Sequence, residues 1–170
     1  NDIPNTVKKA AQNIINLNPE FLTAHISGGK NMLKELVKVK NKTKIIGVTM
    51  LTSLEKNDLK SFGINISESV FVEKLTKVGC ESGVDGVVSS PLEVKQLREK
   101  FGNKLIYITP GIRMSNDNSD DQKRLSTPGK AISDGSSLLV IGRSITSSVN
   151  PINSINKIIA NIRTEIESKN

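Results

Sequence analysis

Two clusters late in the chain combine glycine with arginine, a pairing suited to binding an anion. The segments "ITPGIR" and "VIGRS" each put an arginine directly after a short apolar run. A guanidinium donates two parallel hydrogen bonds to a phosphate, and a glycine leaves its backbone N–H open to the same anion. These residue types predict phosphate binding at these two clusters, with Gly111 and Arg113 in the first and Gly142 and Arg143 in the second. The alternative for Arg143 is an exposed side chain in a surface ion pair.

The elements that position these clusters alternate between short apolar runs and amphipathic segments. The runs are rich in Ile, Val and Leu and do not alternate in polarity, which is typical of parallel strands buried on both faces. The predicted strands are "FLTAHIS", "TKIIGVTML", "DGVVSS", "LIYITPG" and "SSLLVIGRS". Helical segments lie between them, one of them capped by Ser67 or Ser69 and ended by Gly83, another opened by Pro91 and ended by Gly102. Strand–helix repetition of this kind indicates an α/β fold.

Two α/β architectures fit this pattern. Length favours a doubly wound open sheet, because a (β/α)8 barrel typically needs about 250 residues and this chain has 170. The polar strand ends favour the barrel, whose sites lie at the C-terminal ends of its strands and whose phosphate sites follow strands 7 and 8. If "LIYITPG" and "LLVIGR" are strands 7 and 8, the chain covers strands 4 to 8. We therefore predict one TIM-barrel domain over residues 1–170, with strands 1 to 3 preceding residue 1.

The composition restricts the kinds of partner that this protein could bind. The net charge of +7 could serve nucleic-acid binding, but the lysines are scattered, and one Tyr, four Phe and no Trp leave few rings for base stacking. A small anionic substrate suits a basic protein better. No run approaches the roughly 18 apolar residues of a membrane span. A single cysteine, Cys80, rules out an intrachain disulfide, and without a secretory signal we predict a cytoplasmic protein.

Seven stretches in order make the chain resemble the orotidine 5'-phosphate decarboxylase family of the bacterial type. They are "DIPNTV", "AHISGG", "VTMLTSLEKNDL", "DGVVSS", "TPGIR", "DQKRLSTPGKAISDGSSLLVIGRSIT" and "SVNP". The resemblance implies a homodimeric (β/α)8 barrel with active sites at the subunit interface. It implies decarboxylation of orotidine 5'-phosphate to UMP in pyrimidine biosynthesis, with neither a metal nor an organic cofactor, and neither a membrane nor a nucleic acid as partner.

The resemblance also assigns the catalytic group. The family uses an alternating Lys-Asp-Lys-Asp array, and Asp2 in "DIPNTV" matches its last carboxylate, which reaches into the partner's site. The other three array members fall before residue 1, so we expect the 170-residue chain alone to be inactive. A carboxylate beside a catalytic lysine holds it charged and oriented. The alternative for Asp2 is a helix N-cap or a turn residue before Pro4. Thr6 resembles a second residue of the cross-subunit contact, and its alternative is also a cap.

The remaining site residues come from the same resemblance. Arg143 resembles the family's phosphate-binding arginine, with Gly142 offering its backbone N–H. Thr52 and Ser53 resemble the pair that hydrogen-bonds the pyrimidine, with strand-end capping as their alternative. Arg113 resembles a site-lining arginine, and Gln122 resembles the loop residue that bridges phosphate and pyrimidine. Without the resemblance, Gln122 would lie in a solvated loop. His25, the only histidine, has no second ligand nearby in the sequence and is interpreted as structural.

Two other functions stay open on the sequence. One is another ribulose-phosphate-binding barrel enzyme, such as a sugar-phosphate epimerase or a synthase, against which "DIPNTV" and "DQKRLSTPG" argue. The other is a catalytically inactive fragment that binds phosphate or a nucleotide. A partial barrel with two open edges would be poorly stable, which argues against the second.

Overall fold

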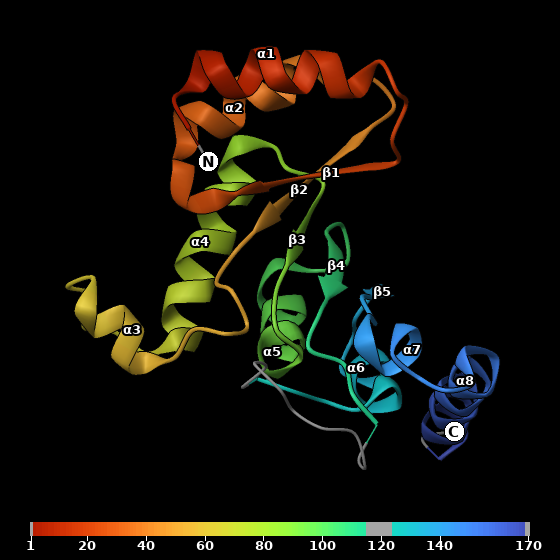
Figure 1. The fold of residues 1–170 in the computed structure, drawn as a ribbon. Coiled ribbons are helices and arrows are strands. Elements are labelled where there is room, and N and C mark those ends of the chain that lie inside the picture. Colours follow the sequence, from red (N-terminus) through yellow and green to blue (C-terminus); the bar gives the residue numbers. More distant parts are fainter. Residues whose placement is uncertain (1, 115–123, 169–170) are drawn as a thin grey trace.

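The protein was analysed as a computed structural model that describes residues 2–114 and 124–168. Five strands and eight α-helices alternate along the described chain (Figure 1). The strands are β1 (Phe21–His25), β2 (Lys44–Val48), β3 (Gly86–Val88), β4 (Ile106–Thr109) and β5 (Leu138–Leu139). The helices are α1 (Pro4–Ile15), α2 (Lys30–Val39), α3 (Lys56–Ser61), α4 (Glu68–Ser82), α5 (Pro91–Phe101), α6 (Pro128–Ser133), α7 (Arg143–Thr146) and α8 (Pro151–Glu167), with a short 3-10 turn, η1 (Ile26–Gly28).

The five strands form one parallel sheet in the order β1-β2-β3-β4-β5, so each strand pairs with its neighbour in sequence. Thr23 lies opposite Ile46, and Ile46 in turn lies opposite Gly86. Because all strands are parallel, their C-terminal ends meet at one edge of the sheet. The loops predicted to carry the site therefore share that edge.

The helices follow the sheet from one end to the other. Figure 1 shows α1 and α2 at the β1 end and α6, α7 and α8 at the β5 end, with α4 and α5 between. Neighbouring helices pack in series, α1 on α2, α2 on α4 and α4 on α5, and α8 packs on both α6 and α7. None of the helices in the described ranges is long and apolar enough to cross a membrane.

The predicted helix ends are confirmed. The Ser67 hydroxyl accepts a hydrogen bond from the Val70 N–H and caps α4, so Ser67 rather than Ser69 is the N-cap. Gly83 ends α4 with φ of 85°, in the left-handed region that glycine adopts without strain. Pro91 opens α5, where its missing N–H costs nothing, and Ser90 caps that helix.

The core lies between the central strands and the helices on them. The strands contribute Ile45, Val87 and Tyr107, and α2 contributes Leu33 and Leu36, all at most 1% exposed. Full burial of one such side chain stabilises the fold by roughly 1.5–3 kcal/mol. This burial fixes the register of β2, β3 and β4, and with it the positions of the loops that follow them.

The prediction of strands buried on both faces holds in the centre of the sheet and fails at β5. That strand is only two residues long, and Leu138 and the following Val140 are 42% and 52% exposed. The physical reason is position, because β5 is an edge strand among the described residues and its outer side packs on no further strand. The sequence analysis also left α3, α6 and α7 unassigned, since each is six residues or shorter.

Candidate active site

The candidate site residues follow different strands and lie along the same edge of the sheet. Thr52 and Ser53 lie in the turn after β2, Arg113 follows β4, and Gly142 and Arg143 follow β5. In parallel α/β proteins this edge holds the ligand. The fold therefore places on one edge the residues that the sequence analysis assigned to the phosphate and the pyrimidine.

Gly142 and Arg143 form the start of α7. The Gly142 carbonyl accepts hydrogen bonds from the N–H groups of Ile145 at 2.8 Å and Thr146 at 3.1 Å, which turns the chain directly after β5. Apart from Gly142 itself and its two neighbours in the chain, no described residue has an atom within 4 Å of the position that a Cβ on Gly142 would take. The Arg143 side chain is exposed at the same turn. An anion approaching this turn would therefore meet an accessible guanidinium and an unhindered backbone.

Arg113 and Thr52 differ from Arg143 in being buried. Arg113 is 9% exposed, and its Nη1 donates to the Ile112 carbonyl at 2.9 Å. Thr52 is 7% exposed, whereas the neighbouring Ser53 is exposed. The Thr52 hydroxyl is therefore held in place by its surroundings, while Ser53 offers its polar groups to solvent or to a ligand.

The backbone beside Arg113 forms a short two-stranded connection, which we name the strap. The Arg113 N–H donates to the Ser126 carbonyl at 3.0 Å, and the Ser126 N–H donates to the Gly111 carbonyl at 3.1 Å. These bonds make an isolated parallel bridge between Ile112 and Ser126. The strap thus joins the chain leaving β4 to the chain entering α6, and it fixes the backbone of Arg113.

Asp2 and Thr6 lie together at the other end of the edge, beside β1. They line a pocket of about 350 Å³ with Thr23 and His25, among others. Both side chains are exposed. The Asp2 Oδ1 accepts a hydrogen bond from the Ile3 N–H at 2.6 Å, but Ile3 rather than Asp2 is the N-cap of α1. Asp2 is therefore not the N-cap of α1, while its hydrogen bond to the Ile3 N–H fits the alternative of a turn residue before Pro4.

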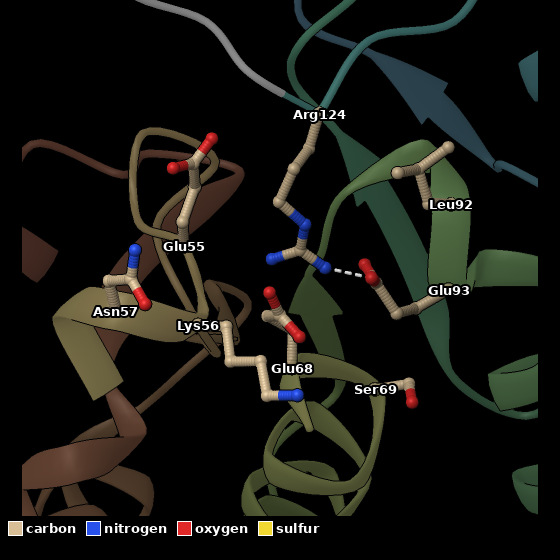
Figure 2. A pocket seen from close by; sticks show the side chains of 8 residues that line it. All are labelled: Glu55, Lys56, Asn57, Glu68, Ser69, Leu92, Glu93 and Arg124. Carbon is tan, nitrogen blue, oxygen red and sulfur yellow. Dashed lines mark hydrogen bonds and ion pairs between the residues drawn. The ribbon is translucent and has the colours of Figure 1, made fainter. Parts of the chain in front are cut away.

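A second pocket contains a buried ion pair that the sequence analysis missed. It has a volume of about 550 Å³ and lies between the N-terminal ends of α3, α4 and α5 (Figure 2). Arg124 and Glu93 line it, and the Arg124 Nη2 donates to the Glu93 Oε1. Two charged residues 31 positions apart give no local pattern that would reveal their pairing.

Three further predictions concern Gln122, metal binding and His25. Gln122 lies outside the described residues. Within residues 2–114 and 124–168, no cluster of three or more His, Cys, Asp or Glu side chains is arranged to hold a metal ion. His25, interpreted as structural, lines the same pocket as Asp2.

The comparisons with known proteins define the class and then the family. The solved structure of orotidine 5'-phosphate decarboxylase from Lactobacillus acidophilus superposes with a TM-score of 0.80 at 34% identity, covering 95% of this chain and 71% of that one. The enzyme from Pyrococcus horikoshii shares the fold, with a TM-score of 0.73 at 19% identity. The class is thus the parallel α/β barrel, of which these five strands form a part.

The family follows from sequence. The profile described as "Orotidine 5'-phosphate decarboxylase / HUMPS family" matches residues 1–158. The orotidine 5'-phosphate decarboxylase of Dictyoglomus thermophilum is 42% identical, with 98% of this chain and 70% of that protein covered. That of Buchnera aphidicola subsp. Schizaphis graminum is 45% identical, with 95% and 70% covered. The chain belongs to the orotidine 5'-phosphate decarboxylase / HUMPS family, as the sequence analysis expected.

Proposed function

We propose that this protein takes part in pyrimidine biosynthesis by decarboxylating orotidine 5'-phosphate to UMP. Family membership over residues 1–158 supports the reaction. The observation that carries the assignment to this site is the placement of Gly142 and Arg143 after β5, on the same edge of the sheet as Arg113 and Thr52. An anion-binding group and a buried hydroxyl on one edge suit a substrate with a phosphate at one end and a pyrimidine at the other.

The phosphate end is assigned to Arg143 and Gly142. Arg143 is exposed and offers a charged, planar donor. A charge-assisted hydrogen bond of this type contributes about 1.5–3 kcal/mol. Arg113 and Gln122 are proposed as further contacts to the substrate, and Thr52 and Ser53 as contacts to the pyrimidine ring.

The chemical step is assigned in part to Asp2. During decarboxylation the bond between the pyrimidine ring and its carboxylate breaks, CO2 leaves, and the electron pair stays on the ring carbon until a proton replaces the lost group. A fixed carboxylate next to the substrate's own disfavours the charged ground state, and it also orients an adjacent lysine ammonium that supplies the proton. The resemblance puts both lysines of the array before residue 1. Asp2 is therefore proposed as the array member that this chain contributes.

Asp2 and Thr6 are proposed to act across a homodimer interface. Both side chains are exposed at the start of α1, beside the C-terminal end of β1. A carboxylate in this position is accessible to a second subunit, which supports a site completed by the partner. A reducing, cytoplasmic environment is proposed alongside, because Cys80 is the only cysteine.

The two alternative functions are not favoured. The relatives from D. thermophilum and B. aphidicola, at 42% and 45% identity, are both orotidine 5'-phosphate decarboxylases rather than epimerases or synthases. The inactive-fragment alternative concerns the 170-residue chain alone and is decided by the assay below.

The test measures turnover of orotidine 5'-phosphate as the loss of the absorbance of its orotate group. We expect no turnover from the 170-residue chain, and turnover from a fusion that joins the upstream segment of the D. thermophilum enzyme to Asn1. In that fusion, Asp2→Asn should lower kcat by roughly 100-fold or more, the usual scale for groups that assist proton transfer. An inactive fusion that is folded would refute the proposed reaction, and turnover by the 170-residue chain would refute the assignment of the lysines.

A further inference from the structure

The Arg124–Glu93 pair is unusual in its burial. Arg124 is 6% exposed and Glu93 5%. The hydrogen bond between them leaves one atom on each side chain, Arg124 Nη1 and Glu93 Oε2, buried without a partner. Burial also lowers the pKa of Arg124, partly opposed by the negative charge of Glu68. Two charges have therefore been taken out of water with incomplete compensation.

Such a pair is a poor way to stabilise a fold. Removing two charges from water costs several kcal/mol per ion, and well-packed apolar side chains of similar volume are often as stable or more so. In some proteins a buried polar or charged pair instead fixes the register of the elements that carry it, because each charge needs its partner within reach. The pair is better explained by what it holds in register than by the stability it contributes.

The partners of Arg124 come from helix N-termini that are themselves fixed. Glu93 is in the first turn of α5 and Glu68 opens α4. Figure 2 shows the Arg124 guanidinium directed between Glu68 and Glu93, with Glu55 and Lys56 across the pocket. Three carboxylates face two cations here, so the pocket suits the retention of Arg124 better than the binding of an external anion.

Arg124 is also joined through the backbone to the candidate substrate site. It lies two residues before Ser126, whose carbonyl and N–H make the two hydrogen bonds of the strap to Arg113 and Gly111. A shift of Arg124 along its pocket would therefore move Ser126 and change the register of the strap. The carbonyl of Ile112, which holds the Arg113 guanidinium at 2.9 Å, belongs to the same strap.

We propose that Arg124 is a positioning residue, which by pairing with Glu93 fixes the register of the strap and so holds Arg113 at the substrate edge. Arg124 touches no substrate in this proposal and acts only through the strap. The proposal rests on the proposed function, because it gives Arg113 a role in nucleotide binding. It adds Arg124 and Glu93, which do not line the substrate edge, and it gives a physical reason why this pair is buried.

The test replaces the pair by apolar side chains, as Arg124→Met with Glu93→Leu, so that no charge is left buried alone. Amide hydrogen exchange then reports the strap, and calorimetry reports the affinity for UMP. We expect the Arg113 and Ser126 amides to exchange roughly tenfold or more faster, with Tyr107 and Ile46 in the central strands unchanged. The Kd for UMP should rise roughly tenfold, equivalent to about 1.4 kcal/mol. Arg124→Lys keeps the charge but loses the planar fork. Its strap exchange rates and its Kd for UMP should lie between those of the unmodified protein and those of the double variant.

The matched control is Lys130→Met with Asp134→Leu, which removes the ion pair between Lys130, whose side chain is 55% exposed, and Asp134, which follows α6. It should leave both the strap amides and the UMP affinity unchanged. Should the double apolar variant fail to fold, Glu93→Gln keeps the shape of the side chain and removes its charge, and the same two measurements decide.

Unchanged Arg113 and Ser126 exchange would overturn the proposal. So would faster exchange throughout the sheet, which would show a general structural role, or faster strap exchange with an unchanged UMP affinity. Failure of the proposed function has a different signature. If the unmodified protein does not bind UMP, the function is refuted, and the exchange measurement alone then decides whether Arg124 sets the register of the strap.

Discussion

At the residue scale, the site depends on two arginines in opposite environments. Arg143 is exposed at the turn after β5, whereas Arg113 is 9% exposed and bonded to a backbone carbonyl. An anion reaches an exposed guanidinium without displacing packed protein, whereas the Arg113 guanidinium is buried and already donates to the Ile112 carbonyl. Arg143 is therefore the side chain whose removal should affect ligand binding most and folding least.

Replacing Arg143 by Ala should raise the Kd for UMP by roughly 10- to 150-fold, the equivalent of a lost charge-assisted interaction of about 1.5–3 kcal/mol. The melting temperature should stay within about 1–2 °C, as expected for a surface substitution. Calorimetric titration and thermal unfolding measure the two effects. Arg163→Ala, at an exposed arginine of α8, is the control, and equal UMP binding by the Arg143 variant would remove Arg143 from the phosphate site.

At the element scale, a close helix contact fixes the C-terminal part of the fold. Gly129 in α6 lies against α8, where a Cβ would come within 2.6 Å of the Asn161 carbonyl oxygen. The Gly129 N–H also donates to the Asn161 Oδ1 at 2.8 Å. Since α8 also packs on α7, this contact helps to hold the helix that begins with Arg143.

The substitution Gly129→Ala should lower the free energy of unfolding by about 1–3 kcal/mol, because the added methyl group meets backbone that has no room to yield. Urea unfolding followed by circular dichroism measures this change. Asn156→Ala, at an exposed position of α8, should change it by less than about 0.5 kcal/mol. If the two variants unfold alike, the approach of α6 to α8 is looser than the structure indicates.

The sequence predicted the long elements well and the short ones poorly. Five strands and the helices with clear start and stop residues, such as Pro91 and Gly83, are confirmed because their local signals agree with their tertiary packing. The six-residue helices α3 and α6 form only where tertiary contacts hold them. The Arg124–Glu93 pair was missed for a related reason, since its partners are brought together by the fold and share no local pattern.

The candidate site residues also differ in how far the sequence could predict them. Residue type and spacing pointed to the two glycine–arginine clusters that hold Arg113 and Arg143. The roles of the individual residues, including Asp2, Thr6, Thr52 and Ser53, entered through the family resemblance. Their placement on one edge could be predicted from the parallel strand pattern. The exposure of Arg143 and the burial of Arg113 could not, because burial depends on which loops pack over each strand end.

At the scale of the whole molecule, the described part of the chain is a section of a barrel with apolar side chains at its β5 end. Ile152 of α8 is 73% exposed, Ile155 39%, and Ile159 41%, and their spacing puts them on one face of the helix. Val140 beside β5 is also half-exposed. Exposed apolar side chains gathered on one helix face favour association in water.

The 170-residue chain should therefore self-associate, with a weight-average mass that rises with concentration in sedimentation velocity. Ile155→Lys with Ile159→Lys should reduce that rise by placing two charges on the apolar face of α8. Asn153→Lys with Thr164→Lys adds the same charge at exposed positions on the opposite side of α8 and should leave the association unchanged. A weight-average mass that does not change with concentration would show that this face of α8 does not mediate self-association.

The measurement that tests the central claim most directly compares UMP with uridine, which differ only in the phosphate, by calorimetric titration of the 170-residue chain. If the edge after β5 binds phosphate, UMP should bind at least roughly tenfold more tightly than uridine, an advantage of about 1.4 kcal/mol or more. Added salt should weaken the binding of UMP and leave that of uridine unaffected. Equal affinity for the two ligands, or a failure to bind either, would contradict the assignment of Gly142 and Arg143 and the function built on it.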